Sequence, residues 1–140
     1  MKGKMKTRIT FMIIAAMAYF TSCQQVEQTG STPERKAAIK VAIMYPNVEG
    51  KAFNMDYYAN SHMPMVAELF GDSLITYSID QGISGRTSED TADYIAIGTF
   101  YFEKLSAYGN SFGPNEEQIL SDIPNYTDIQ PIVQISKVID

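Results

Sequence analysis

The 140-residue sequence has a formal net charge of −5, with 45% hydrophobic and 19% charged residues, which is ordinary for a globular protein. The first 22 residues hold four of the eleven basic residues and none of the sixteen acidic ones, so the remainder is strongly acidic. An acidic body lacks the basic face that nucleic-acid phosphates require, and no nucleic-acid partner is expected. The length is that of one domain behind a short leader.

Residues 1–22 follow the order of a secretory signal, in which basic residues come first, then an apolar run, then small residues. The apolar run extends from Ile9 to Phe20, which is shorter than the roughly 20 residues that cross a bilayer as a helix. The sequence therefore predicts a cleaved signal peptide, with a retained short membrane anchor as the alternative.

Cys23 is the only cysteine and directly follows two small residues, so it cannot form an internal disulfide. Its position resembles the lipobox of bacterial lipoproteins. That resemblance implies lipidation of Cys23, export, and anchoring to the cell envelope on the periplasmic face. Residues 23–38 are then a polar tether, and residues 39–140 form the folded domain.

The first elements of that domain are a strand and a helix. A strand is expected at residues 39–45, where β-rich apolar residues precede a turn. A helix is expected over residues 55–70, because apolar residues recur at three- and four-residue steps and Gly71 can end it. Pro64 lies inside this helix and is expected to kink it, since proline removes a backbone donor.

The remaining elements complete a recognisable order. Two long strands at 74–83 and 93–102, joined by a polar loop, should form a hairpin, and short helical segments follow at 104–112 and 115–121. A last strand is expected at 129–139. The order β-α-β-β-α-β predicts an α+β, ferredoxin-like antiparallel sheet with helices on one face.

The other face of this sheet also needs cover, because the later strands carry apolar side chains on both sides. The simplest cover is the same face of a second copy, which gives a homodimeric α/β barrel without free sheet edges. A monomer with a partly solvated sheet face is the alternative.

Three segments resemble the EthD family of dimeric α/β-barrel proteins. Tyr-Ala-Asn-Ser-His-Met-Pro-Met-Val at residues 58–66 is similar to the family's Tyr-x-x-x-His-x-Pro helix, and residues 101–108 are similar to its passage into the second helix. Asp-Ile-Pro-Asn-Tyr-Thr-Asp at residues 122–128 is close to the family's Asp-Ile-Pro-Asn-Phe-Thr-Asp. The resemblance implies the barrel fold and a pocket, and the family's relatives include cofactor-free isomerases, decarboxylases, cyclases and monooxygenases.

His62 is the only histidine, and a histidine near neutral pH can take up and return a proton. Its place on the helical stripe directs it toward the sheet. There it is either a general acid/base at a pocket wall or a buried histidine bonded to backbone or tyrosine. Tyr58 lies four residues earlier on the same face, where it either orients the imidazole or belongs to the core.

Further candidate residues are tyrosines on the expected strands and one aspartate. Tyr45, Tyr77 and Tyr101 suit contacts with an apolar or aromatic ligand that carries oxygen. Asp122 is either a second carboxylate in the site or a loop residue that sets the turn into the last strand. The sequence offers no metal-ligand spacing and no nucleotide-binding loop, so no metal or other cofactor is expected.

Together these features predict an EthD-like, cofactor-independent enzyme of oxidoreductase, isomerase or lyase type. It would act by proton transfer through His62 and Tyr58 on a small apolar or aromatic oxygenated molecule. The alternative is a non-catalytic lipoprotein that binds a ligand or takes part in an assembly.

Overall fold

The computed structural model of the protein describes residues 36–139, which lie in one compact unit, Pro33–Asp140. Within the described residues, no helix is long and apolar enough to cross a membrane. The signal segment and Cys23 lie outside the described residues, so cleavage and lipid attachment stay predictions.

The described chain forms a four-stranded sheet in the order β2-β3-β1-β4, with every neighbouring pair antiparallel. The expected hairpin is present as the pairing of β2 with β3, and the predicted α+β, ferredoxin-like fold is confirmed. The last strand begins only after Pro131, since proline has no backbone N–H to offer a neighbouring strand. The strands are β1 (Ile39–Pro46), β2 (Leu74–Gln81), β3 (Tyr94–Phe102) and β4 (Ile132–Lys137).

The helical run expected over residues 55–70 forms in three consecutive parts. Asn54 caps its start, because its side-chain oxygen accepts the backbone N–H of Tyr57 at 3.1 Å. Gly71 closes it with a positive φ of 52°, a conformation that glycine adopts without steric cost. The parts are α1 (Met55–Tyr57), a π-helical turn (Tyr58–His62) and α2 (Met63–Phe70).

The π-helical turn is the response of this helix to Pro64. The N–H of Met63 donates to the carbonyl of Tyr58, five residues back, which widens the turn just before the proline. Pro64 lacks an N–H, and in a regular helix its ring would crowd the carbonyl of Asn60. A wider turn relieves that crowding and keeps the helix continuous. Where the sequence predicts a kink at Pro64, the structure has a π turn that ends at His62.

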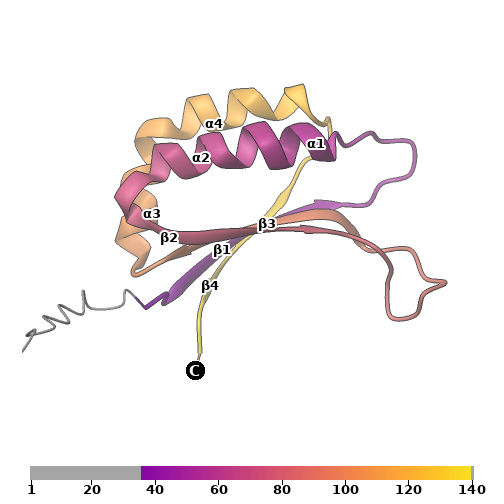
Figure 1. The fold of residues 1–140 in the computed structure, drawn as a ribbon, viewed down its shortest axis with the longest axis horizontal. Helices are drawn as coiled ribbons and strands as arrows, with labels where there is room; N and C mark the ends of the chain where they lie inside the picture. Colours follow the sequence, from indigo (N-terminus) through magenta and orange to yellow (C-terminus); the bar gives the residue numbers. More distant parts are fainter. Residues whose placement is uncertain (1–35, 140) are drawn as a thin grey trace, which may run out of the picture. The chain divides into compact units, whose positions relative to one another are not determined.

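All the helices lie on one side of the sheet, where α4 runs beside the α1–α2 run (Figure 1). Short 3₁₀ turns flank α4 on both sides. The second half of the layer is formed by α3 (Leu105–Phe112) and α4 (Glu116–Asp122).

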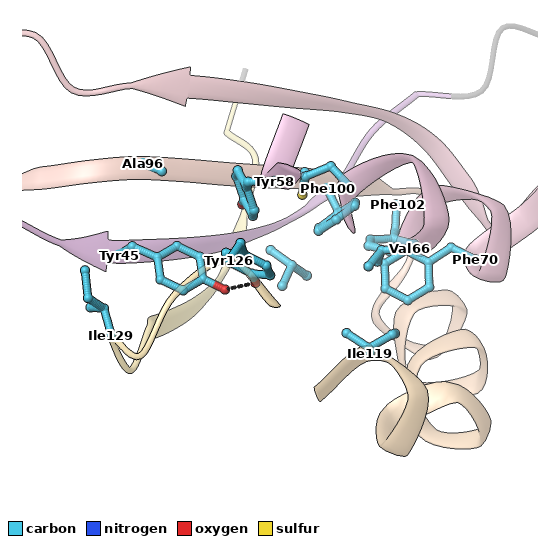
Figure 2. Close-up of a cluster of buried hydrophobic side chains, with 12 residues drawn as sticks. Tyr45, Tyr58, Val66, Phe70, Ala96, Phe100, Phe102, Ile119, Tyr126 and Ile129 are labelled. Carbon is cyan, nitrogen blue, oxygen red and sulfur yellow. Dashed lines mark hydrogen bonds between the residues drawn. The ribbon is translucent and has the colours of Figure 1, made fainter. Parts of the chain in front are cut away.

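The hydrophobic core fills the space between sheet and helices (Figure 2). Val41 of β1 and Phe102 of β3 are completely buried. Phe70 of α2 packs edge to face against Phe100 and Phe102, with ring centroids 5.1 and 5.4 Å apart. This core holds the helices at a fixed height above the sheet, and the site is built in that gap.

The opposite face of the sheet differs in character. Because side chains alternate along a strand, the residues between the core positions point away from the helices, including Thr76 and Asp80 of β2 and Tyr101 of β3. On the edge strand β4, Ile132 pairs with Met44 on this same face and is about half exposed. The homodimer that would cover this face stays a prediction.

Candidate functional site

A cavity of about 90 Å³ lies between the sheet and the helices. Its wall is mostly apolar and is built by β1, β3, the π turn, α2, α3, α4, the 3₁₀ turn after α4, and β4. Among the described residues that line it, His62 is the only histidine, and none is an aspartate, glutamate, lysine or arginine. Leu120 and Val133 belong to the wall and are 47% and 52% exposed, so the cavity opens to solvent between α4 and β4.

His62 is held at this wall by Asp122, the last residue of α4. The imidazole is buried, and its Nδ1 lies 2.8 Å from Oδ2 of Asp122. An ionised carboxylate can only accept a hydrogen bond, so the imidazole proton must lie on Nδ1. Nε2 then carries the lone pair, and it has no hydrogen-bond partner within residues 36–139. The arrangement presents a free basic nitrogen on the side of the ring away from Asp122.

The other carboxylate oxygen of Asp122 has two donors of its own. The Tyr57 hydroxyl donates to Oδ1 at 2.8 Å, and Asn125 Nδ2 donates to the same atom at 2.8 Å. Burial by itself would raise the pKa of Asp122, but hydrogen bonds from His62, Asn125 and Tyr57 outweigh it and leave the pKa below its usual value. Asp122 is therefore ionised at neutral pH.

Burial has the larger influence on the histidine. It lowers the pKa of His62, and the hydrogen bond and charge of Asp122 only partly oppose the change. The ring is therefore neutral at pH 7. A neutral imidazole with its proton on Nδ1 is the form that accepts a proton at Nε2.

Aromatic rings enclose the imidazole. Tyr126 packs against it with ring centroids 4.7 Å apart, and Tyr58 stacks on it at 5.7 Å. The hydroxyls of Tyr45 and Tyr126 share a 2.6 Å hydrogen bond (Figure 2). Burial raises the pKa of Tyr58 and of Tyr126, so both stay neutral and surround His62 with a rigid, low-polarity wall.

The structure brings some of the predicted site residues to the cavity. His62, Tyr58 and Tyr45 line it. The contact of Tyr58 with His62 is ring stacking rather than a hydrogen bond, because its hydroxyl points to the sheet at Gly98. A Cβ atom at Gly98 would lie 2.1 Å from that oxygen, so only glycine leaves room for Tyr58 there. The hydroxyl is buried without a hydrogen-bond partner among the described residues.

Other predicted residues lie elsewhere. Tyr77 packs on the ring of Phe100 with centroids 6.1 Å apart and is outside the cavity wall. Tyr101 faces the opposite side of the sheet. Asp122 does not line the cavity and reaches it only through His62. In the structure Asp122 is the hydrogen-bond partner of His62, and a contact of Asp122 with a ligand stays a prediction.

Sequence reasoning missed three residues that build the site: Tyr57, Asn125 and Tyr126. Asn125 and Tyr126 lie in the segment of residues 122–128, whose resemblance to the EthD family was the available signal. Tyr57 carried no signal beyond its position next to Tyr58. Among residues 36–139, no group of three or more His, Cys, Asp or Glu side chains is placed to hold a metal ion.

Comparisons with known proteins agree with this fold. A sequence model of the EthD domain matches residues 49–130. The crystal structure of an EthD-like protein from Ralstonia eutropha JMP134 is 35% identical and covers 75% of this chain and 95% of its own, with a TM-score of 0.71. An ethyl tert-butyl ether D (EthD) family protein from Bacillus halodurans C-125 is 9% identical over 73% of this chain and 99% of its own, with a TM-score of 0.54, a likeness of fold alone. No curated protein matches the chain significantly.

Proposed function

Since the chain belongs to the EthD family, we propose that it is an enzyme that moves a proton with His62 as general base and needs no cofactor for that step. One observation carries the proposal. A neutral imidazole, fixed by Asp122 through Nδ1, belongs to the wall of an apolar cavity and has no protein partner at Nε2 among the described residues. A buried base with a free lone pair beside an apolar cavity fits proton abstraction.

The step balances within one substrate molecule. A C–H bond next to a carbonyl breaks, its proton goes to Nε2 of His62, and its electron pair stays on the substrate as an enolate. The imidazolium that forms is stabilised by the carboxylate of Asp122. While it is on the imidazolium, this proton can exchange with solvent protons. The imidazolium then returns a proton to a different atom of the substrate, which makes the overall reaction an isomerisation.

The cavity wall indicates an uncharged substrate. No lysine or arginine among the described residues lines the cavity, so a carboxylate or phosphate would be buried without a counter-charge. An engineered cavity of about 150 Å³ holds benzene, whereas this one measures about 90 Å³. The substrate is therefore a small carbonyl compound, or a longer one whose reacting end enters past Leu120 and Val133.

Hydrogen exchange tests the proposal even while the product is unidentified. Neutral carbonyl compounds are incubated with the protein in deuterated water, and deuterium uptake at carbon is followed by NMR. We expect the wild-type protein to accelerate uptake for at least one compound. His62→Gln should lower that rate about 10²–10⁴-fold, the usual contribution of a positioned base.

The matched control is Glu68→Gln, which changes an exposed residue on the same helical run and should leave the rate unchanged. Equal rates for the wild-type protein and His62→Gln would contradict the proposal. Tight binding of a compound without any exchange would favour the non-catalytic ligand-binding function instead.

A further inference from the structure

We infer that Tyr57 and Asn125 are positioning residues that hold Asp122 in the one orientation in which it keeps the proton of His62 on Nδ1. The inference deepens the proposed function and rests on it, because the location of that proton matters for catalysis only if Nε2 is the base. Neither residue lines the cavity among the described residues. Both would act through Asp122.

The position of Asp122 shows why it needs these donors. It is the last residue of α4, where the partial negative charge of the helix end disfavours a carboxylate. Three side-chain donors from separate elements offset this unfavourable interaction by hydrogen bonding to the carboxylate. His62 comes from the π turn, Tyr57 from α1, and Asn125 from the 3₁₀ turn that follows α4.

The two oxygens of the carboxylate have separate partners. Oδ2 receives His62, while Oδ1 receives both Tyr57 and Asn125, and Asn125 Nδ2 also lies 3.3 Å from the Tyr57 hydroxyl. Two donors on Oδ1 fix the rotation of the carboxylate, so Oδ2 stays aimed at Nδ1. Hydrogen bonds to a charged acceptor are stronger and more directional than neutral ones.

Without these donors the carboxylate of Asp122 could rotate away from His62. The Asp122 side chain is 17% exposed, so water is available to a rotated carboxylate. His62 Nδ1 would then lose its only acceptor among the described residues. The proton could move to Nε2, and that tautomer has no lone pair at Nε2 to accept a substrate proton.

Few other groups face His62 and could set its tautomer. Tyr58 stacks on the imidazole, Tyr126 packs against it with its ring tilted by 51°, and the hydroxyl of Tyr126 bonds to Tyr45. These tyrosines are neutral near pH 7, because burial raises their pKa values. Asp122 is the charged partner, so the tautomer of His62 reports on the orientation of Asp122.

Nitrogen-15 NMR tests this directly, because His62 is the only histidine of the chain and its ring signals need no assignment. The wild-type protein should show the Nδ1–H tautomer alone. In the double variant Tyr57→Phe/Asn125→Ala, the ratio of Nε2–H to Nδ1–H tautomers should rise about tenfold or more, the usual equilibrium effect of a hydrogen bond to a charged group. The phenyl ring keeps the stacking of Tyr57 on Tyr126.

The matched control is Tyr45→Phe, which removes a buried tyrosine hydrogen bond in the same cluster without changing a donor to Asp122. A purely structural role of Tyr57 and Asn125 predicts lower thermal stability with the tautomer unchanged, and that result in the folded double variant would overturn the inference. If the double variant does not fold, the two single variants decide by the same criterion, each with a smaller expected shift.

The tautomer measurement needs no substrate, so this inference and the proposed function can fail separately. A tautomer that depends on Tyr57 and Asn125, in a protein that exchanges no substrate proton, rejects the proposed function and keeps the positioning role. Substrate proton exchange that depends on His62, with an unchanged tautomer in the Tyr57 and Asn125 variants, supports the proposed function and rejects the positioning role.

Discussion

The two faces of the sheet differ in composition and burial, although the same strands build both. On the helix side, β1 and β3 contribute Val41, Phe100 and Phe102, which are at most 4% exposed. On the other side, β2 presents polar residues such as Thr76 and Asp80. Period-two alternation assigns each strand residue to one of these faces.

The difference between the two faces explains why the ionisable pair of His62 and Asp122 lies on the helix side. His62 and Asp122 lie on the helix side, in a gap that the packed aromatic residues keep apolar. Low polarity strengthens the interaction between the two groups and lowers the basicity of the imidazole. The opposite face, mixed in polarity, offers no such enclosure within residues 36–139.

The largest expected effect comes from changing Asp122, which tests whether the helix-side pair is the working part of the molecule. Asp122→Asn keeps the shape but lets the amide donate to Nδ1, which forces the proton of His62 onto Nε2. The rate of substrate deuterium uptake should fall about 10²–10⁴-fold. Asp128→Asn is the matched control. Asp128 lies in the same segment as Asp122, but it pairs with Lys51 and does not contact His62. A wild-type rate in Asp122→Asn would show that the pair does not act as a unit.

The next effect compares neighbouring residues on the two faces of β3. Phe102→Ala should lower the free energy of unfolding by about 3–5 kcal/mol, since a buried aromatic side chain leaves a cavity. Tyr101→Ala, one residue earlier and on the other face, should cost about 1 kcal/mol, the typical value for a point mutation. Urea unfolding measures both. A loss for Tyr101→Ala as large as that for Phe102→Ala would indicate that a second copy of the chain buries this face in solution.

The smallest effect is a dependence of stability on pH that arises on the helix side. The pKa of His62 is lower in the folded protein than in the unfolded chain. Below about pH 6.5 the unfolded chain therefore binds more protons, and the free energy of unfolding decreases as the pH is lowered. Asp122, whose pKa is also lowered in the folded protein, continues the loss at more acid pH. Urea unfolding between about pH 7 and about pH 5 should show this slope, and His62→Gln should flatten it. An unchanged slope in that variant would place the titrating group elsewhere.

Local sequence patterns determined most of the fold. The β-rich segments, the apolar stripe of the first helix and the stop at Gly71 predict elements within a few residues of those observed, and their order predicts the ferredoxin-like sheet. The inward direction of His62 followed from the same stripe. These features are predictable because side-chain periodicity depends only on neighbours along the chain.

Tertiary structure alone decided the composition of the site. His62 and Asp122 are 60 positions apart, and Tyr57 and Asp122 are 65 apart. They meet because the core sets the α1–α2 run and α4 side by side above the sheet. The same packing turned the hydroxyl of Tyr58 to Gly98 and away from His62. Periodicity assigns a residue to a face, but which residue of another element it contacts depends on how two packed helices are aligned, and no local pattern encodes that alignment.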